Sequence, residues 1–222
     1  MSAVNKLNSA EAARGRFITL EGGEGCGKST QAARLRDALA QRGLGVVLAR
    51  DPGSTALAES LRGLIKDQRE DAPCGSCELM LFLAARAQLV ERVVRPALAA
   101  GKWVVCDRFS DSTVAYQGYG RGLPVDDIRR MNDFVCGGVA PDLTLYLSLS
   151  PEAAQARRRS REVSTRTEAD RIEREGARFH ARLHEGFEAL AKAHPERIKT
   201  IDASGDEEAV WNQIWKSVLP LI

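Results

Sequence analysis

The fold is decided by eight residues near the N-terminus, Gly22-Gly23-Glu24-Gly25-Cys26-Gly27-Lys28-Ser29. They match the phosphate-binding pattern G-x-x-x-x-G-K-[ST] in full, a pattern that is specific only where a strand precedes it and a helix follows. An apolar run over 16–21 comes directly before the motif, and a helical pattern over 29–41 follows it. We therefore predict a loop that binds phosphate groups through its backbone amides and a helix N-terminus.

Two side chains of this loop, and two at the end of a later apolar run, carry the expected phosphate chemistry. The positively charged Lys28 would bind the β- and γ-phosphates of a nucleotide, and the Ser29 hydroxyl would bind Mg²⁺. Asp107 ends the apolar run over 102–107, where an aspartate can hold the metal or its waters. Arg108 follows with a planar guanidinium that suits a phosphate. The predicted nucleotide-binding residues are Gly22, Gly23, Glu24, Gly25, Cys26, Gly27, Lys28, Ser29 and Thr30, and the predicted metal ligands are Ser29 and Asp107.

Apolar runs alternate with helical patterns along the rest of the chain. The expected strands cover 16–21, 45–50, 102–107, 143–149 and 197–201, and the expected helices cover 29–41, 77–100, 126–135, 151–160, 169–193 and 206–218. Pro96 should kink the second of these helices or end it early. The alternation predicts an α/β fold, a P-loop NTP hydrolase-like sandwich with a central five-stranded parallel sheet flanked by helices on both faces.

Length, charge and cysteine content exclude several classes of protein. The 222 residues suit a single domain, expected over 16–222, after a disordered extension over 1–15 that lacks the apolar stretch of a secretory signal. A formal net charge of +2 gives no overall attraction to nucleic acid or an anionic membrane. No apolar run reaches the ~18 residues that span a bilayer. Five scattered cysteines suit a reducing compartment, so we expect a cytoplasmic protein.

Six short segments in a fixed order resemble the thymidylate kinase family. They are residues 20–25, 50–55, 81–86, 107–109, 115–118 and 170–173. The resemblance implies that the chain is a P-loop nucleoside monophosphate kinase, with ATP as phosphoryl donor and Mg²⁺ as cofactor. It implies that dTMP is phosphorylated to dTDP, a step in dTTP synthesis, and that the protein is a homodimer.

The resemblance also assigns roles in binding the acceptor nucleotide. Phe82 would stack on thymine and Arg86 would hydrogen-bond the base, and their i, i+4 spacing places them on one helix face. Thr113, Tyr116 and Gln117 would line the opposite wall of this pocket, with Tyr116 against the sugar. The full predicted substrate-binding set is Glu24, Asp51, Pro52, Phe82, Arg86, Arg108, Thr113, Tyr116 and Gln117.

Two further contacts are implied, and two alternatives stay open. Glu24 would accept a hydrogen bond from the deoxyribose 3′-hydroxyl or lie near the metal, and Arg108 would bind the monophosphate. Phe82 could instead be a simple core residue, since its spacing fits core packing equally well. Gln117 could be a surface loop side chain, because glycines follow it closely.

An arginine-rich stretch marks a predicted lid over about 152–173. Arginines can stabilise the charge on a transferring phosphoryl group. Some members of the family carry the catalytic arginine in the phosphate loop; this loop has none, so the resemblance assigns the role to the lid. The predicted catalytic residues are Lys28, Arg108, Arg157, Arg159 and Arg161, with Arg157 and Arg161 favoured among the lid arginines. A solvated basic helix face remains the alternative for some of them.

Two other functions compete with this interpretation. Another P-loop nucleoside monophosphate or deoxynucleoside kinase would keep the phosphate loop and change the base pocket, and the presence of Phe82, Arg86 and Gln117 argues against it. A regulatory GTP-binding switch would need an Asn-Lys-x-Asp element after a strand. The Asn-Lys pair at residues 5–6 lacks the aspartate and lies ahead of the first predicted strand.

Overall fold

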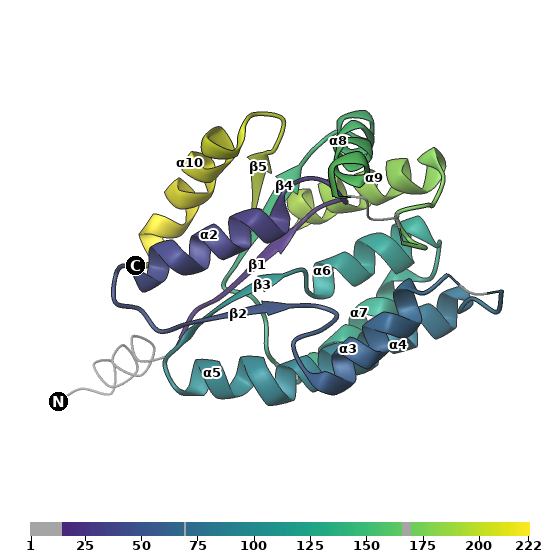
Figure 1. Cartoon of the computed structure of the whole chain (residues 1–222). Helices are drawn as coiled ribbons and strands as arrows, with labels where there is room; N and C mark the ends of the chain where they lie inside the picture. Colours follow the sequence, from purple (N-terminus) through teal and green to yellow (C-terminus); the bar gives the residue numbers. More distant parts are fainter. Residues whose placement is uncertain (1–14, 69, 166–169) are drawn as a thin grey trace.

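The computed structural model describes residues 15–68, 70–165 and 170–222, and its strands form one sheet (Figure 1). The strands are β1 (Phe17–Glu21), β2 (Val46–Arg50), β3 (Trp103–Asp107), β4 (Leu143–Ser148) and β5 (Ile198–Asp202). Their order across the sheet is β2-β3-β1-β4-β5, and every neighbouring pair is parallel. The predicted five-stranded parallel sheet is confirmed. The predicted extension over 1–15 lies, apart from Gly15, outside the described residues.

Helices cover both faces of the sheet, with α2 and α10 on one face and α4, α5 and α7 on the other (Figure 1). The α-helices are α2 (Lys28–Ala40), α3 (Ala56–Lys66), α4 (Gly75–Leu89), α5 (Arg95–Ala99), α6 (Ser110–Thr113), α7 (Val125–Cys136), α8 (Pro151–Thr165), α9 (Ala177–Ala193) and α10 (Glu207–Val218). Two π-helical segments, η1 (Val90–Val94) and η2 (Val114–Gly120), and a short 3-10 helix, η3 (Leu219–Leu221), complete the described elements.

The central strand β1 is buried on both faces. Because successive side chains of a strand point to opposite faces, Ile18 and Leu20 pack with Leu35 of α2 and Ile214 of α10. Phe17 packs on the other face, with apolar residues of α4 and α5. This burial explains the continuous apolar runs of the sequence. It also fixes the carboxyl end of β1, where the phosphate loop begins.

One helix boundary differs clearly from the sequence prediction. The helix expected from residue 169, which itself lies outside the described residues, begins at Ala177. Asp170 instead closes a turn, because its Oδ1 atom accepts hydrogen bonds from the backbone N–H groups of Ile172 and Glu173, both at 2.9 Å. An aspartate that binds nearby backbone amides favours a turn over a helix interior.

Three other helical regions differ from the sequence prediction. The helix expected over 77–100 is α4, η1 and α5 in succession: a π-helical segment interrupts the α-helix directly before Pro96, and the chain stays helical to Ala99. Helix α3 was not predicted, although Thr55 caps it by accepting a hydrogen bond from the Ala58 N–H at 3.1 Å. The segment α6–η2 was not predicted either, since its two glycines disfavour helix.

Candidate active site

A cavity of about 520 Å³ opens beyond the carboxyl ends of β1 and β3, where ligands bind in open parallel sheets. The predicted residues that line it are Glu24, Gly25, Gly27, Lys28, Ser29, Thr30, Asp51, Pro52, Phe82, Arg86, Asp107, Arg108, Thr113, Tyr116, Gln117 and Arg157. Gly22, Gly23 and Cys26 belong to the loop but do not line the described cavity wall. Most of the predicted set is therefore brought together at one place.

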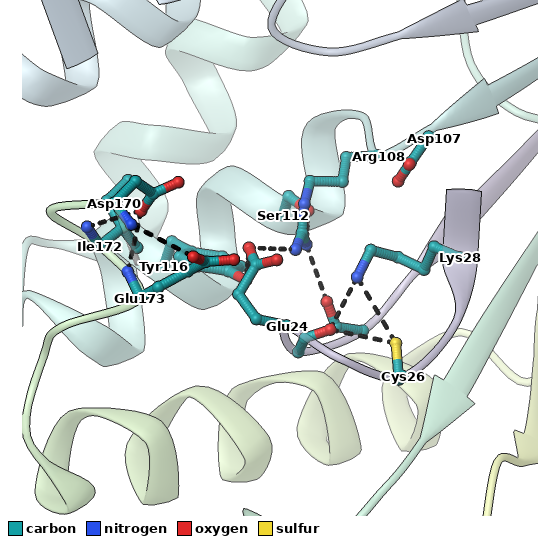
Figure 2. A network of polar contacts seen from close by, with 12 residues as sticks. Glu24, Cys26, Lys28, Asp107, Arg108, Ser112, Tyr116, Asp170, Ile172 and Glu173 are labelled. Atoms are coloured by element: carbon teal, nitrogen blue, oxygen red, sulfur yellow. Dashed lines mark hydrogen bonds and ion pairs between the residues drawn. The ribbon is translucent and has the colours of Figure 1, made fainter. Parts of the chain in front are cut away.

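The phosphate loop joins β1 to α2 and depends on glycines with left-handed backbone. Gly25 has a φ of +80° and Gly27 a φ of +93°, conformations that strain other residues. A Cβ atom on Gly25 would lie 2.9 Å from the carbonyl oxygen of Ala154, so α8 packs directly on the loop. Lys28 is buried, and its Nζ donates to the Gly23 carbonyl oxygen at 2.7 Å (Figure 2). The loop thus holds its own lysine close to the phosphate-binding amides.

The predicted metal ligands meet where the loop approaches β3. The Ser29 hydroxyl donates to Oδ2 of Asp107 at 2.5 Å. The second carboxylate oxygen, Oδ1, is buried and has no hydrogen-bond partner among the described residues. A buried oxygen without a partner is costly, and hydroxyl and carboxylate oxygens are the ligands that Mg²⁺ prefers. These two residues therefore fit the ion that the sequence predicts.

Arg108 occupies a strained position in the middle of the cavity. Its φ is +70°, which is uncommon outside glycine and is found mainly at functional sites. Its Nη1 donates to the Gly22 carbonyl oxygen at 2.7 Å and to the Ser112 hydroxyl at 3.3 Å, and its Nη2 donates to Oε1 of Glu24 at 2.5 Å (Figure 2). The guanidinium also lies 5.0 Å above the Tyr116 ring. The protein thus fixes this cation before a phosphate binds.

Two carboxyl groups beside Arg108, the buried Glu21 and the half-buried Glu24, have pKa values shifted in opposite directions. Burial alone would raise the pKa of Glu24, but nearby cations, Arg108 foremost, hold that pKa well below its usual range. Burial, reinforced by Asp111, raises the pKa of Glu21 to about 7 despite a hydrogen bond from Ser112. Glu24 is therefore a permanent anion at the cavity, whereas Glu21 changes its charge near neutral pH.

Arg86 lines the cavity, and most of its guanidinium N–H groups are hydrogen-bonded to the protein. Its side chain is 1% exposed. Its Nε donates to Oδ2 of Asp51 at 2.6 Å, its Nη1 to Oδ1 of Asn132 at 2.5 Å, and its Nη2 to the Phe109 carbonyl oxygen at 3.1 Å. A guanidinium has five N–H groups, so two remain for a ligand. The half-buried Phe82 lines the same cavity.

Three buried oxygen atoms at this end of the cavity lack a hydrogen-bond partner among the described residues. They are Oδ1 of Asp51, Oγ1 of Thr113 and Oε1 of Gln117. Buried polar atoms are nearly always satisfied in native proteins, so this wall suits a ligand with its own polar groups. Gln117 is buried in η2, and the surface-loop alternative for it is wrong.

Sequence reasoning missed Arg62, Lys66 and Ser112, which also line the cavity. Arg62 donates to the Pro52 carbonyl oxygen at 3.0 Å, and burial lowers the pKa of this arginine. Arg62 and Lys66 belong to α3, whose cap at Thr55 was the available signal. Because α3 was not predicted, the sequence could not indicate that the side chains of Arg62 and Lys66 face the cavity.

The lid arginines take different positions on α8. Arg157 lines the cavity, and its Nη2 donates to the carbonyl oxygens of Ser204 and Gly205 at 3.1 and 3.0 Å. Arg158 is buried against His180, and Arg159 is exposed. The side chain of Arg161 lies outside the described part of the chain. Among the described arginines of α8, Arg157 is the one that reaches the cavity.

Comparisons with known proteins identify the family to which this site belongs. The sequence model of the family described as Thymidylate kinase matches residues 20–214. The chain belongs to the thymidylate kinase family. The thymidylate kinase of Gloeobacter violaceus is 52% identical over 202 residues, which cover 91% of this chain and 93% of that protein. The thymidylate kinase of Alkalilimnicola ehrlichii is 46% identical over 198 residues, which cover 89% of each chain.

A solved thymidylate kinase has the same fold. The crystal structure of the enzyme from Ehrlichia chaffeensis matches with a TM-score of 0.73 at 32% identity, over 92% of this chain and 99% of that chain. The predicted family and P-loop fold are confirmed. As a thymidylate kinase, the chain is an ATP-dependent phosphotransferase that converts dTMP to dTDP, and another acceptor class is not favoured. None of the described helices has the length and apolar content of a membrane span.

Proposed function

We propose that this cavity binds ATP and dTMP together and that the phosphoryl group passes between them beside Arg108. The supporting observation is that Lys28, Arg108 and the unsatisfied oxygens of Thr113 and Gln117 share one cavity of about 520 Å³. Transfer between two bound phosphates depends on positioning and charge neutralisation, so no covalent enzyme intermediate is needed.

The donor half is assigned to the phosphate loop and the lid. Lys28, the loop amides and Thr30 would hold ATP, and Arg157 would stabilise the transferring group, since this residue lines the cavity. Arg159 and Arg161 remain candidates from the sequence pattern, although Arg159 is exposed here. We assign the lid to residues 152–173, within the single domain over 16–222; the stretch 166–169 lies outside the described residues.

Ser29 and Asp107 are the residues that would hold Mg²⁺. The unpartnered Oδ1 atom of Asp107 supports this assignment. When bound, the ion supplies positive charge to the phosphate oxygens. Lys28 supplies charge to the same oxygens from the protein side, and its burial strengthens that interaction.

The acceptor half is assigned to the opposite wall of the cavity. Phe82 offers an aromatic face to the base, and the remaining N–H groups of Arg86 and the free oxygens of Thr113 and Gln117 offer polar contacts. Tyr116 packs beside the sugar. The phosphate-side loop, Asp51 and Pro52, completes the set with Glu24, which would accept a hydrogen bond from the 3′-hydroxyl.

We also propose a cytoplasmic homodimer. Four large apolar side chains are exposed on three neighbouring helices: Leu57 and Leu64 of α3, Met80 of α4 and Phe134 of α7. Helix α4 contacts both α3 and α7 (Figure 1). Exposed apolar groups on adjacent helices suit an interface with a second copy. All five cysteines are free, which suits a reducing compartment.

Coupled release of ADP tests the acceptor assignment. The protein is supplied with ATP and Mg²⁺ and then with dTMP, dUMP, dCMP, dGMP, AMP or thymidine in turn. We expect dTMP to be the best acceptor, with dUMP second, because the base wall suits a keto pyrimidine. Turnover with a purine nucleotide or with thymidine alone would contradict the roles of Phe82, Arg86 and Gln117. Omission of Mg²⁺ should abolish turnover.

A further inference from the structure

Glu78, in the first turn of α4, is not one of the proposed substrate-binding residues, but it contacts one of them, Gln117. Its side chain is 1% exposed. Its Oε1 accepts hydrogen bonds from Nε2 of Gln117 at 2.9 Å and from Nε of Arg121 at 3.1 Å. Its Oε2 accepts from Nη2 of Arg121 at 3.0 Å and from Nη2 of Arg171 at 2.5 Å. Both oxygens of this buried carboxyl group are therefore surrounded by donors.

The surroundings keep Glu78 ionised. Burial alone would raise the pKa of Glu78, but hydrogen bonds from Arg121 and Gln117 outweigh burial and lower it. A carboxylate accepts hydrogen bonds and donates none. The amide nitrogen of Gln117 must therefore face Glu78, because the amide oxygen would be repelled there. The planar amide then has a single favourable orientation.

This orientation decides which atom of Gln117 the cavity presents. Oε1 of Gln117 is buried and has no hydrogen-bond partner among the described residues, and the residue lines the cavity. A buried carbonyl oxygen can be satisfied only by a donor. Thymine and uracil carry an N–H donor at N3, whereas the N3 atom of cytosine carries a lone pair.

We propose that Glu78 is a positioning residue that holds the Gln117 carbonyl oxygen toward the acceptor base and so favours pyrimidines with an N3–H donor. The proposal rests on the assignment of Gln117 to the base pocket. A reversed amide would offer its N–H groups to the N3 lone pair of cytosine. A site built around one hydrogen bond strongly rejects an analogue that cannot form it. Glu78 thus acts on selectivity through Gln117 and does not touch the substrate.

The test is the ratio of kcat/KM for dTMP to kcat/KM for dCMP in Glu78→Gln. This change keeps the shape of the side chain but allows it to donate, so either orientation of Gln117 becomes possible. We expect the ratio to fall at least roughly tenfold, mainly through a higher KM for dTMP, with kcat nearly unchanged. Glu175→Gln is the matched control. Glu175 also accepts a hydrogen bond from Arg121 but does not contact Gln117, so the ratio should stay constant.

Two further variants separate this role from a structural one. Glu78→Asp keeps an acceptor-only carboxylate, so it should retain the dTMP preference even if the Tm falls. A Glu78→Gln protein with a lower Tm and an unchanged ratio would overturn the proposal. Gln117→Leu tests the underlying assignment separately: an unchanged KM for dTMP in that variant would remove Gln117 from the base pocket. A raised KM in Gln117→Leu, with an unchanged ratio in Glu78→Gln, would overturn the orientation effect alone.

Discussion

At the residue scale, Arg108 is constrained by its backbone and its side chain together. Its left-handed φ of +70° directs the guanidinium toward the Gly22 carbonyl oxygen and Glu24. Burial alone would lower the pKa of Arg108, but Glu24 and other anions raise it well above its ordinary value. The arginine therefore keeps its charge at every pH at which the protein works. Strain of this kind, about 1–3 kcal/mol for a non-glycine residue, persists only where the surroundings enforce it.

Glu21, beside Arg108, makes stability depend on pH. Its pKa rises from 4.5 to about 7 on folding, so between these values the folded protein binds a proton that the unfolded chain has released. The stabilising contribution is complete below pH 4.5 and is lost as the pH rises through 7. In Glu21→Gln, which cannot ionise, we expect this loss to disappear. From pH 5 to pH 8, the free energy of unfolding of the unmodified protein should fall by about 3 kcal/mol more than that of the variant.

Urea titration at the two pH values gives the required free energies of unfolding. A suitable control is Glu59→Gln, because the pKa of the half-buried Glu59 is lowered rather than raised by hydrogen bonds from Ser54 and Arg50, despite its partial burial. That variant should not gain stability relative to the unmodified protein as the pH rises. Parallel pH profiles for Glu21→Gln and the unmodified protein would show that Glu21 stays ionised in the folded state.

At the element scale, α8 lies directly against the phosphate loop. The contact is closest at Gly25, where an added Cβ would meet the Ala154 carbonyl oxygen at 2.9 Å and the Arg158 side chain at 3.2 Å. The lid helix and the loop therefore share one packing surface. A change in that surface should alter ATP binding as well as stability.

Gly25→Ala measures this contact against Gly43→Ala. Both glycines have a φ of +80°, but a Cβ on Gly43 would meet nothing within 4 Å. Each variant should lose about 1–2 kcal/mol of stability through the left-handed backbone. We expect Gly25→Ala alone to raise the KM for ATP, by roughly tenfold or more, because α8 must move from the loop. Equal kinetics in the two variants would show that the contact does not matter for ATP binding.

The lid arginines provide a second comparison on the same helix. Arg157 reaches the cavity and Arg159 is exposed, only two residues further along α8. Removing a charge that stabilises the transferring phosphoryl group should lower kcat by roughly 100-fold or more in Arg157→Ala. Arg159→Ala should stay within about twofold of the unmodified enzyme. Steady-state kinetics with saturating ATP and dTMP would check both, and a larger loss in Arg159→Ala would reverse the assignment.

Features of the structure that leave a local pattern in the sequence were predicted well. Features that depend on contacts between distant segments were not. Continuous apolar runs identified β1, β3 and β4, because a strand buried on both faces leaves that pattern. The edge strands β2 and β5 are partly exposed, and their predicted positions also agree with the structure. Helix α3 was missed although Leu57, Leu61, Leu64 and Ile65 recur at helical spacing and Thr55 caps its first turn. The predicted site residues came from motifs, whereas Arg62 and Glu78 are defined by partners in other segments of the chain. Pro52 and Gln117 are such partners, and no local pattern predicts these contacts.

At the scale of the whole molecule, the exposed apolar side chains of α3, α4 and α7 favour association. Phe134 is 86% exposed, an extreme value for a large aromatic residue in a folded domain. Burial of such a side chain against a second copy would contribute about 2–3 kcal/mol. The same helices carry Arg62 and Arg86, which line the cavity, so an interface there would also support the acceptor side of the site.

Phe134→Asp tests the homodimer, with Leu219→Asp as the control. Leu219 is also exposed, at 51%, but it lies in η3 near the C-terminus, away from α7 (Figure 1). Light scattering after gel filtration should give the mass of two chains for the unmodified protein and for Leu219→Asp. Phe134→Asp should give the mass of one chain. A dimer that survives Phe134→Asp would place the interface elsewhere.

The ion pair between Glu24 and Arg108 has a consequence for the empty enzyme in the cell. Inorganic phosphate and other small anions compete with nucleotides for positive charge, and a bare arginine in a cavity would attract them. The carboxylate of Glu24 already accepts a hydrogen bond from that arginine, in the place that a phosphate oxygen would take. A small anion that displaces this carboxylate replaces one ion pair with another and gains little binding free energy. A nucleotide gains more, because its base and sugar make further contacts. We therefore expect small anions to inhibit the resting enzyme only weakly.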